Sequence, residues 1–194
     1  MIVINDLHIG ALRSAGATVS SAVSLRQFQL DTLKGILDEV DEELTILGDL
    51  FDTYNIPASD ILATYQLLTA WLVKGHKLNL VPGNHDLSKD SGKLSSFEFM
   101  GKLLLAYPSV TYIKGGGWVN EAEGVYAISH VDNQDLFDME LIKVPECRYL
   151  LLHANYNNGF AVNSDHSLNV SQDQAENAKC EKLVFAHEHY TREA

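Results

Sequence analysis

Short apolar runs alternate along the chain with longer stretches in which apolar residues recur at helical spacing. The runs that predict strands are 2–4, 44–47, 77–81, 110–113, 125–129, 149–152 and 183–185. Helices are predicted from Ser24, from Ser59 and from about Ser95, and a shorter helix is predicted over 133–142. Buried strands that alternate with amphipathic helices are typical of α/β folds.

Boundary residues support the predicted helices. Ser24 and Gln27 have the spacing of a capping box, and Phe28 belongs to the apolar stripe that follows. Ser59 is predicted to cap the second helix, whose apolar stripe includes Leu62. The remaining polar stretches are predicted to be loops, chiefly 10–23 and 154–178, with a break at the glycine run 115–117. A loop as long as 154–178 in a compact domain is usually functional or mobile.

Residues of the types that bind metals follow five of the strands. They are Asp6, His8, Asp49, Asn84, His153, His187 and His189. Ligand and catalytic groups gather at the carboxyl ends of parallel strands, so we expect these side chains to meet. Nitrogen and oxygen ligands without cysteine suit manganese, iron or zinc. Seven ligands are too many for one metal with an open position, so we expect two metals that share one carboxylate.

Length and composition narrow the class of protein. A single domain is expected over residues 1–194, with a hydrophobic content of 46% that is ordinary for a globular chain. No apolar run approaches the roughly 18 residues of a membrane span, and no signal peptide is evident. Cys147 and Cys180 form no C-x-x-C pair, which favours a reducing, cytoplasmic setting. The sequence leaves the oligomeric state open.

The polar blocks resemble those of the calcineurin-like metallophosphoesterases. Five ordered blocks carry the resemblance: Asp6-x-His8, Gly48-Asp49-x-x-Asp52, Gly83-Asn84-His85-Asp86, His153 and His187-x-His189. One departure is Ala186, where the family usually has glycine. The resemblance implies an α/β fold with two mixed β-sheets packed as a sandwich and flanked by helices. One more strand normally follows the final block in the family, and here the sequence ends five residues after His189, so a fold lacking the C-terminal strand is expected.

The resemblance also implies a role for each matching residue. The first metal would be held by Asp6, His8, Asp49 and His189, and the second by Asp49, Asn84, His153 and His187. A hydroxide that bridges the two metals, most simply two Mn²⁺ ions, would attack phosphorus. His85 would protonate the leaving oxygen or stabilise the transition state, and the Asp52 carboxylate would orient its ring. Asp86 would have a structural hydrogen-bonding role.

Basic residues are few near the motifs, and this bears on the substrate. Arg13, Lys89 and Lys93 are the candidates, and Arg13 is predicted to contact the substrate. His130 follows a strand and could reach a substrate phosphate; because no ligand motif includes it, a structural role is the alternative. A net charge of −12 predicts no broad basic patch for nucleic acid.

The predicted reaction is hydrolysis of phosphate esters, with phosphodiesters favoured over monoesters. The amino acids within the motifs resemble those of the repair-exonuclease branch of the family and those of bacterial and phage phosphodiesterases. A phosphomonoester is a dianion and would gain more from an arginine clamp than a diester would, so the scarcity of basic residues near the motifs also favours a diester. We therefore expect a nuclease acting on short or single-stranded ends, or an enzyme for small nucleotide diesters. The alternatives are a phosphomonoesterase acting on a small molecule or phosphoprotein, and a non-catalytic scaffold with the same fold.

Overall fold

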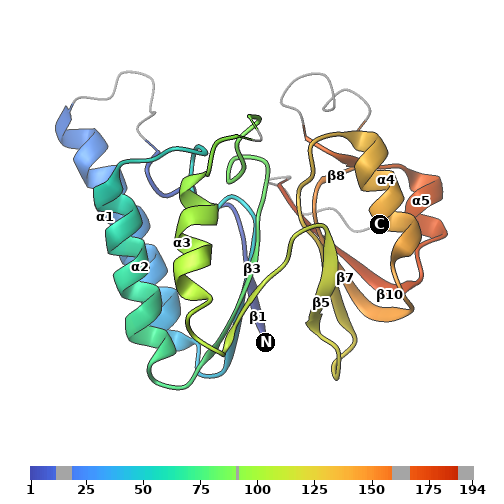
Figure 1. The fold of residues 1–194 in the computed structure, drawn as a ribbon, viewed down its shortest axis with the longest axis horizontal. Helices are drawn as coiled ribbons and strands as arrows, with labels where there is room; N and C mark the ends of the chain where they lie inside the picture. Colours follow the sequence, from blue (N-terminus) through green and yellow to red (C-terminus); the bar gives the residue numbers. More distant parts are fainter. Residues whose placement is uncertain (12–18, 91, 159–166, 188–194) are drawn as a thin grey trace.

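Two four-stranded sheets lie face to face, with helices on their outer sides (Figure 1). The computed structural model describes residues 1–11, 19–90, 92–158 and 167–187. The first sheet has the order β1 (Ile2–Ile4), β2 (Glu43–Leu47), β3 (Lys77–Val81) and β4 (Val110–Tyr112), and all its pairs are parallel. The second has the order β10 (Cys180–Ala186), β7 (Cys147–His153), β6 (Val125–Ile128) and β5 (Gly116–Asn120), and only β5 pairs antiparallel. The predicted two-sheet α/β architecture is confirmed.

Helices cover each sheet on the side that faces away from the other sheet (Figure 1). The first sheet is covered by α1 (Val19–Glu39), α2 (Ala58–Leu72) and α3 (Ser96–Leu104). The second is covered by α4 (Gln134–Lys143) and α5 (Gln172–Glu176), beside a short pair of strands, β8 (Asn155–Tyr156) and β9 (Asn169–Val170). Within the described part of the chain, none of the helices is long and apolar enough to cross a membrane.

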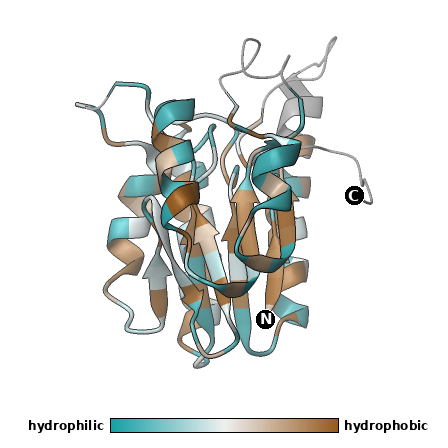
Figure 2. Cartoon of the chain, turned by 90° about the vertical axis from the view of Figure 1, so that its right-hand side faces the viewer, coloured by the Kyte–Doolittle hydropathy of each residue, from teal (hydrophilic) through white to brown (hydrophobic). Residues whose placement is uncertain are grey.

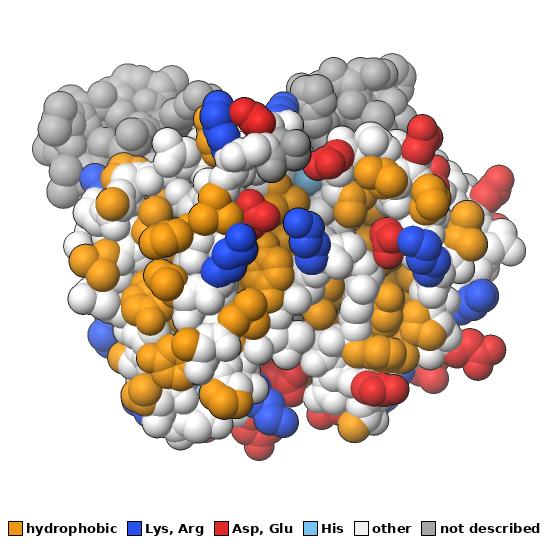
Figure 3. All heavy atoms as spheres, in the orientation of Figure 1, with side chains coloured by type: hydrophobic (Ala, Val, Ile, Leu, Met, Phe, Trp, Pro, Cys, Tyr) orange, Lys and Arg blue, Asp and Glu red, His pale blue; other side chains and the backbone are white. Residues whose placement is uncertain are grey.

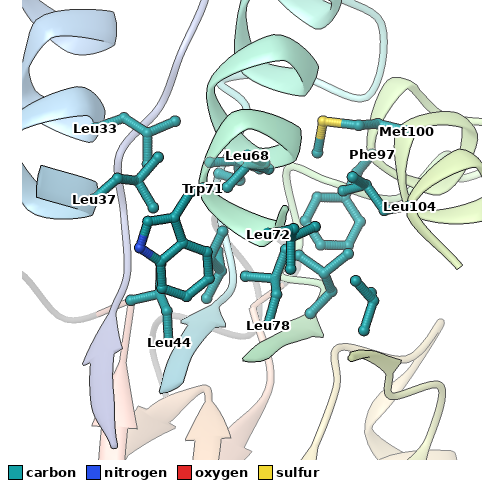
Figure 4. Packing of buried hydrophobic residues seen from close by; sticks show 14 of the residues in the cluster. Leu33, Leu37, Leu44, Leu68, Trp71, Leu72, Leu78, Phe97, Met100 and Leu104 are labelled. Carbon is teal, nitrogen blue, oxygen red and sulfur yellow. The ribbon is translucent and has the colours of Figure 1, made fainter. Parts of the chain in front are cut away.

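Apolar side chains fill the space between these layers. Figure 2 shows hydrophobic colour on the central strands and a mixture of hydrophilic and hydrophobic segments on the helices. Trp71 of α2 is at the centre of the helix-to-sheet core, where Leu33, Leu44 and Leu78 pack nearby (Figure 4). The indole nitrogen of Trp71 donates a hydrogen bond to the carbonyl oxygen of Val40 at 3.0 Å, so its polar atom is satisfied despite burial. The core therefore fixes α1 and α2 against the sheet.

The parallel pairing places the ligand-bearing strand ends at one edge. Ile4 is the register partner of Ile46, and Leu47 is the partner of Val81. In the second sheet, Ala186 is the partner of His153. Strands β1, β2, β3, β7 and β10 consequently end side by side, and the residues that follow them share the edge of the sandwich.

Helix boundaries differ from the sequence prediction in two places. The first helix begins at Val19, so Ser24 lies within it and cannot be its cap, and the predicted loop 10–23 is partly helical. The second helix begins at Ala58 after Pro57, with no side-chain cap, so Ser59 is already helical. A proline with its fixed φ takes the place of the expected serine hydrogen bond.

Two predicted core positions and two predicted loops are also corrected. Phe28 is 67% exposed and Leu62 is 56% exposed, because each helix is wider than the stripe that its sheet covers. The predicted break between strands falls at Gly115, whose φ is 70°, whereas Gly116 and Gly117 already belong to strand β5. The predicted loop 154–178 contains β8, β9 and α5.

Candidate metal centre

The backbone turns sharply at four of the predicted ligands. Asp6, His8, Asp49 and His187 have positive φ angles of 53°, 47°, 51° and 88°. A left-handed conformation costs a non-glycine residue about 1–3 kcal/mol and persists only where its surroundings hold it. Here the Asp6 amide donates to the Gly48 carbonyl at 3.2 Å, and the His8 amide donates to the Asp49 carbonyl at 3.0 Å. These bonds extend the pairing of β1 with β2 and bring both turns together.

Two glycines let the ligand segments approach closely. A Cβ atom added at Gly48 would lie 2.1 Å from Nδ1 of His153. One added at Gly83 would lie 2.2 Å from Oδ1 of Asp49. Gly48 also has a φ of +82°, which disfavours any other residue. The glycines in the two sequence motifs thus make room for the ligand side chains.

Asp49 lies at the centre of the cluster and is only 1% exposed. Its Oδ2 is 3.2 Å from Nε2 of His153 and 4.0 Å from Nε2 of His8, and its Oδ1 accepts a hydrogen bond from the His85 amide at 3.0 Å. Burial acts to raise the pKa of Asp49, but the hydrogen bond and charge of His153 outweigh it and lower the pKa to about 2. This carboxylate is therefore charged at neutral pH.

His153 presents one ring nitrogen to the cluster. Its Nδ1 is 3.0 Å from the carbonyl oxygen of Leu47, and because a carbonyl oxygen only accepts, Nδ1 carries the hydrogen. Its Nε2 faces both Asp49 and, at 3.1 Å, Oδ1 of Asn84. Burial acts to lower the pKa of His153, but the Asp49 carboxylate raises it overall. A cation bound here would displace the Nε2 proton, the usual arrangement for an oriented metal-binding histidine.

Asp6 and His187 complete the described part of the ligand set. Oδ2 of Asp6 accepts a hydrogen bond from the His187 amide at 3.2 Å, and the rings of His187 and His153 are 5.2 Å apart. Nε2 of His8 is 3.9 Å from Oδ1 of Asp6, and burial lowers the pKa of His8, which favours the neutral form that binds metals.

Over the residues that the structure describes, three groups of side chains have potential ligand atoms within 4.8 Å of one another, and one of them is His8, Asp52 and His85, of which only His8 is a predicted ligand. The predicted ligands by themselves form two overlapping groups. Asp6, His8 and Asp49 have ligand atoms within 4.8 Å of one another, and so do Asp49, His153 and His187. Asp49 belongs to both groups, as expected for a carboxylate shared by two metals. Such sets of carboxylate and imidazole donors fit divalent cations.

His85 lies next to this cluster and is oriented by Asp52. Nδ1 of His85 is 2.5 Å from the backbone oxygen of Asp52, so Nδ1 donates and Nε2 is the free ring nitrogen. The expected contact was with the Asp52 carboxylate, whose Oδ1 lies instead 3.6 Å from Nδ1 of His8. The turn after β2 explains the difference, because it directs the carbonyl of Asp52, and not its side chain, at the ring.

Asp86 has the hydrogen bonds that its structural role requires. Its two oxygens accept hydrogen bonds from the amides of Phe51 and Gly83, each at 3.0 Å. Burial, followed by the charge of Asp49, raises the pKa of Asp86 to about 7. Asp86 thereby ties the turn after β3 to the turn after β2.

Of the remaining predicted site residues, Arg13, His130 and His189, the structure describes only His130. Arg13 and His189 lie outside the described residues. His130 is described, and its amide donates to the Pro82 carbonyl at 2.9 Å. Burial lowers the pKa of His130 to about 4, so its ring is neutral, and within the described residues its Nδ1 has no hydrogen-bond partner.

One residue that sequence reasoning missed is Gln29 of α1. Its side-chain nitrogen donates to the His8 carbonyl at 2.5 Å, and its side-chain oxygen accepts from the Gly10 amide at 3.3 Å. These two bonds clamp the turn that carries His8, and Gln29 is only 8% exposed. A polar residue among the apolar positions of a buried helix face is the signal that could have identified it.

Fold and site together define a phosphoesterase with a metal centre at the edge of a β-sandwich. The chain belongs to the calcineurin-like phosphoesterase family, whose sequence profile matches residues 1–191. Members are metal-dependent hydrolases of phosphate esters, so this protein is a metal-dependent phosphoesterase. A similar solved structure is the protein of unknown function AQ665 from Aquifex aeolicus, with 17% identity, 88% of each chain covered and a TM-score of 0.41. Comparison with curated proteins gives no match.

Proposed function

We propose that this enzyme hydrolyses phosphodiesters in preference to phosphomonoesters, with two Mn²⁺ ions as its cofactors. The observation that carries the two-metal proposal is the position of Asp49 in both ligand groups. His8, His153 and His187 add imidazole donors to carboxylate oxygens, a set that manganese accepts and that iron and zinc also accept. His189 is proposed as a further ligand of the first metal, on its motif alone.

The preference for diesters is supported by where the arginines are engaged. Of the described arginines, Arg26 pairs with buried Asp60, and Arg148 pairs with Glu181 near the start of β10. Neither forms a clamp at the ligand cluster, and such a clamp would favour a monoester dianion over a diester monoanion. The net charge of −12 further favours small nucleotide diesters or single-stranded ends over long duplex DNA.

The chain's own residues have defined parts in the proposed reaction. When bound, two divalent cations would lower the pKa of a water molecule and neutralise the phosphoryl oxygens. Asp49 and Asn84 would help to hold the second metal, while the Leu47 carbonyl holds His153 in its ligand tautomer. Nε2 of His85 would give a proton to the leaving oxygen, because Nδ1 is committed to the Asp52 carbonyl.

The deciding experiment compares bis-nitrophenyl phosphate with mononitrophenyl phosphate in the presence of Mn²⁺. Faster turnover of the diester is expected, followed by cleavage of a labelled single-stranded oligonucleotide or of a dinucleotide. Parallel reactions with Fe²⁺ and Zn²⁺ test the choice of metal. Faster turnover of the monoester with an intact oligonucleotide would establish the phosphomonoesterase alternative and refute the diester proposal.

A further inference from the structure

A hollow of about 360 Å³ lies beside the candidate metal centre on the side of His85. Its lining residues are Thr53, Tyr54, Asn84, His85, Leu87, Ser88, Lys89, Asp90 and Lys93. This volume is near the lower end of the range for small-molecule sites, so the hollow suits one small group and not a macromolecule. Because Asn84 and His85 belong to the candidate site, a group bound here would adjoin the reacting phosphate.

The turn that contributes Thr53 and Tyr54 to the hollow is attached to the start of α3. The Ser96 amide at the start of α3 donates to the Tyr54 carbonyl at 2.7 Å, and Oγ1 of Thr53 donates to the Asn55 carbonyl at 3.1 Å. The Tyr54 side chain is nevertheless 43% exposed. An aromatic ring on a fixed turn is a suitable surface on which a nucleobase can stack.

Two lysines, Lys89 and Lys93, also line the hollow. Among the described residues, Lys89 has no ion-pair partner, and Lys93 lies 3.4 Å from Asp90 with a side chain that is 63% exposed. An exposed pair of this kind holds its members weakly, so both ammonium groups are available to a ligand. Figure 3 shows lysine or arginine side chains beside acidic ones at the upper centre of the face that it draws. In a chain with a net charge of −12, Lys89 and Lys93 offer local attraction for an anion.

We propose, building on the proposed phosphodiesterase activity, that this hollow is a leaving-group subsite for a 5′-nucleotide. The base stacks on Tyr54, and the 5′-phosphate lies near Lys89 and Lys93. With the dinucleotide pApA, the oxygen of water forms a bond to phosphorus and the P–O3′ bond breaks. The O3′ atom takes a proton from His85, and the water proton that is released restores the histidine. The products are two molecules of 5′-AMP, whereas ApA, which lacks the 5′-phosphate, gives adenosine and 5′-AMP.

The test compares pApA with ApA, two substrates that differ only in the phosphate proposed to meet the lysines. The wild-type enzyme with Mn²⁺ is expected to have a higher kcat/KM for pApA, by about three- to tenfold for contacts with exposed lysines. Lys89→Ala and Lys93→Ala should reduce this preference by lowering kcat/KM for pApA more than kcat/KM for ApA. Lys102→Ala, which removes an exposed lysine of α3 outside the hollow, is the matched control and should keep the preference.

Tyr54 is tested separately, because stacking affects both dinucleotides. Tyr54→Ala should raise KM for pApA and ApA alike, whereas Tyr54→Phe, which keeps the ring, should retain the wild-type values. Bis-nitrophenyl phosphate monitors the proposed activity itself. Hydrolysis of this ester together with equal kcat/KM for pApA and ApA would overturn the subsite and leave the phosphodiesterase proposal intact.

Product binding makes the subsite testable without catalysis. Calorimetric titration with 5′-AMP and with adenosine should give the tighter binding for 5′-AMP, and Lys89→Ala should remove the difference. If no diester is hydrolysed, the proposed activity fails, and this titration still decides the subsite. Equal affinity of the wild-type protein for 5′-AMP and adenosine would refute it.

Discussion

Gly48→Ala is expected to damage the metal centre through a single added methyl group. Gly48 has a φ of +82°, and its new Cβ atom would lie 2.1 Å from Nδ1 of His153. The left-handed backbone costs about 1–2 kcal/mol for alanine, and overpacking of a filled site costs about 1–3 kcal/mol more. The imidazole must move away, which breaks its bond to the Leu47 carbonyl. Loss of such an orienting bond typically weakens metal binding by about 10- to 100-fold.

Gly75→Ala is the matched control for this substitution. Gly75 has a φ of +98°, but a Cβ atom added there would meet nothing within 4 Å. The free energy of unfolding of Gly75→Ala should therefore fall only by the cost of the left-handed backbone, about 1–2 kcal/mol, and its metal affinity should equal that of the wild type. Urea unfolding of the metal-free proteins measures the free energy of unfolding, and calorimetric titration with Mn²⁺ measures affinity. Equal stability losses and equal Mn²⁺ affinities for Gly48→Ala and Gly75→Ala would refute the steric reasoning.

Three further outcomes are expected. His85→Ala should keep its metals and lower kcat by about 10²–10⁴, with a smaller loss for nitrophenyl esters, whose leaving group needs little protonation; an equal loss for good and poor leaving groups would argue against proton donation. Gln29→Ala should weaken Mn²⁺ binding by about tenfold in calorimetric titration, because the turn that carries His8 loses two hydrogen bonds. The control Gln27→Ala removes only a surface hydrogen bond to Asp31 and should keep the wild-type affinity. Equal Mn²⁺ affinities of the two variants would contradict this reasoning. His130 has a folded pKa of about 4, below its unfolded value of 6.5, so its neutral form stabilises the fold above pH 6.5 and this contribution is lost as the pH falls towards 4. Between pH 7.5 and pH 5 the metal-free wild type should therefore lose about 2 kcal/mol more unfolding free energy than His130→Gln, as measured with urea.

The strand ends could be predicted from the sequence because their signal is local. The apolar run that stops at Gly48 and is followed by Asp49 predicts both the end of β2 and the candidate ligand next to it. Strands β2 and β7 belong to different sheets, and the face-to-face packing of the two sheets, which the family resemblance implied, places His153 next to Asp49. The fold class and the family follow from the same pattern.

What the sequence could not provide depends on contacts between distant segments. The exposure of Phe28 reflects how much of α1 the sheet covers, which no residue near Phe28 encodes. The orientation of His85 by the carbonyl of Asp52 depends on one backbone turn, and a carboxylate in the motif suggested the wrong atom. Gln29 acts on a turn about twenty residues away, and its partners are backbone atoms that the sequence pattern does not mark.

The most direct test of the central claim is the metal content of Asp49→Asn. Because Asp49 belongs to both ligand groups, a neutral amide there should not hold two cations against their mutual repulsion. Mass spectrometry after equilibration with Mn²⁺ should find two ions per chain in the wild type and fewer than two in the variant, with turnover of bis-nitrophenyl phosphate abolished. Two retained ions together with near-normal turnover in Asp49→Asn would contradict the shared-carboxylate account.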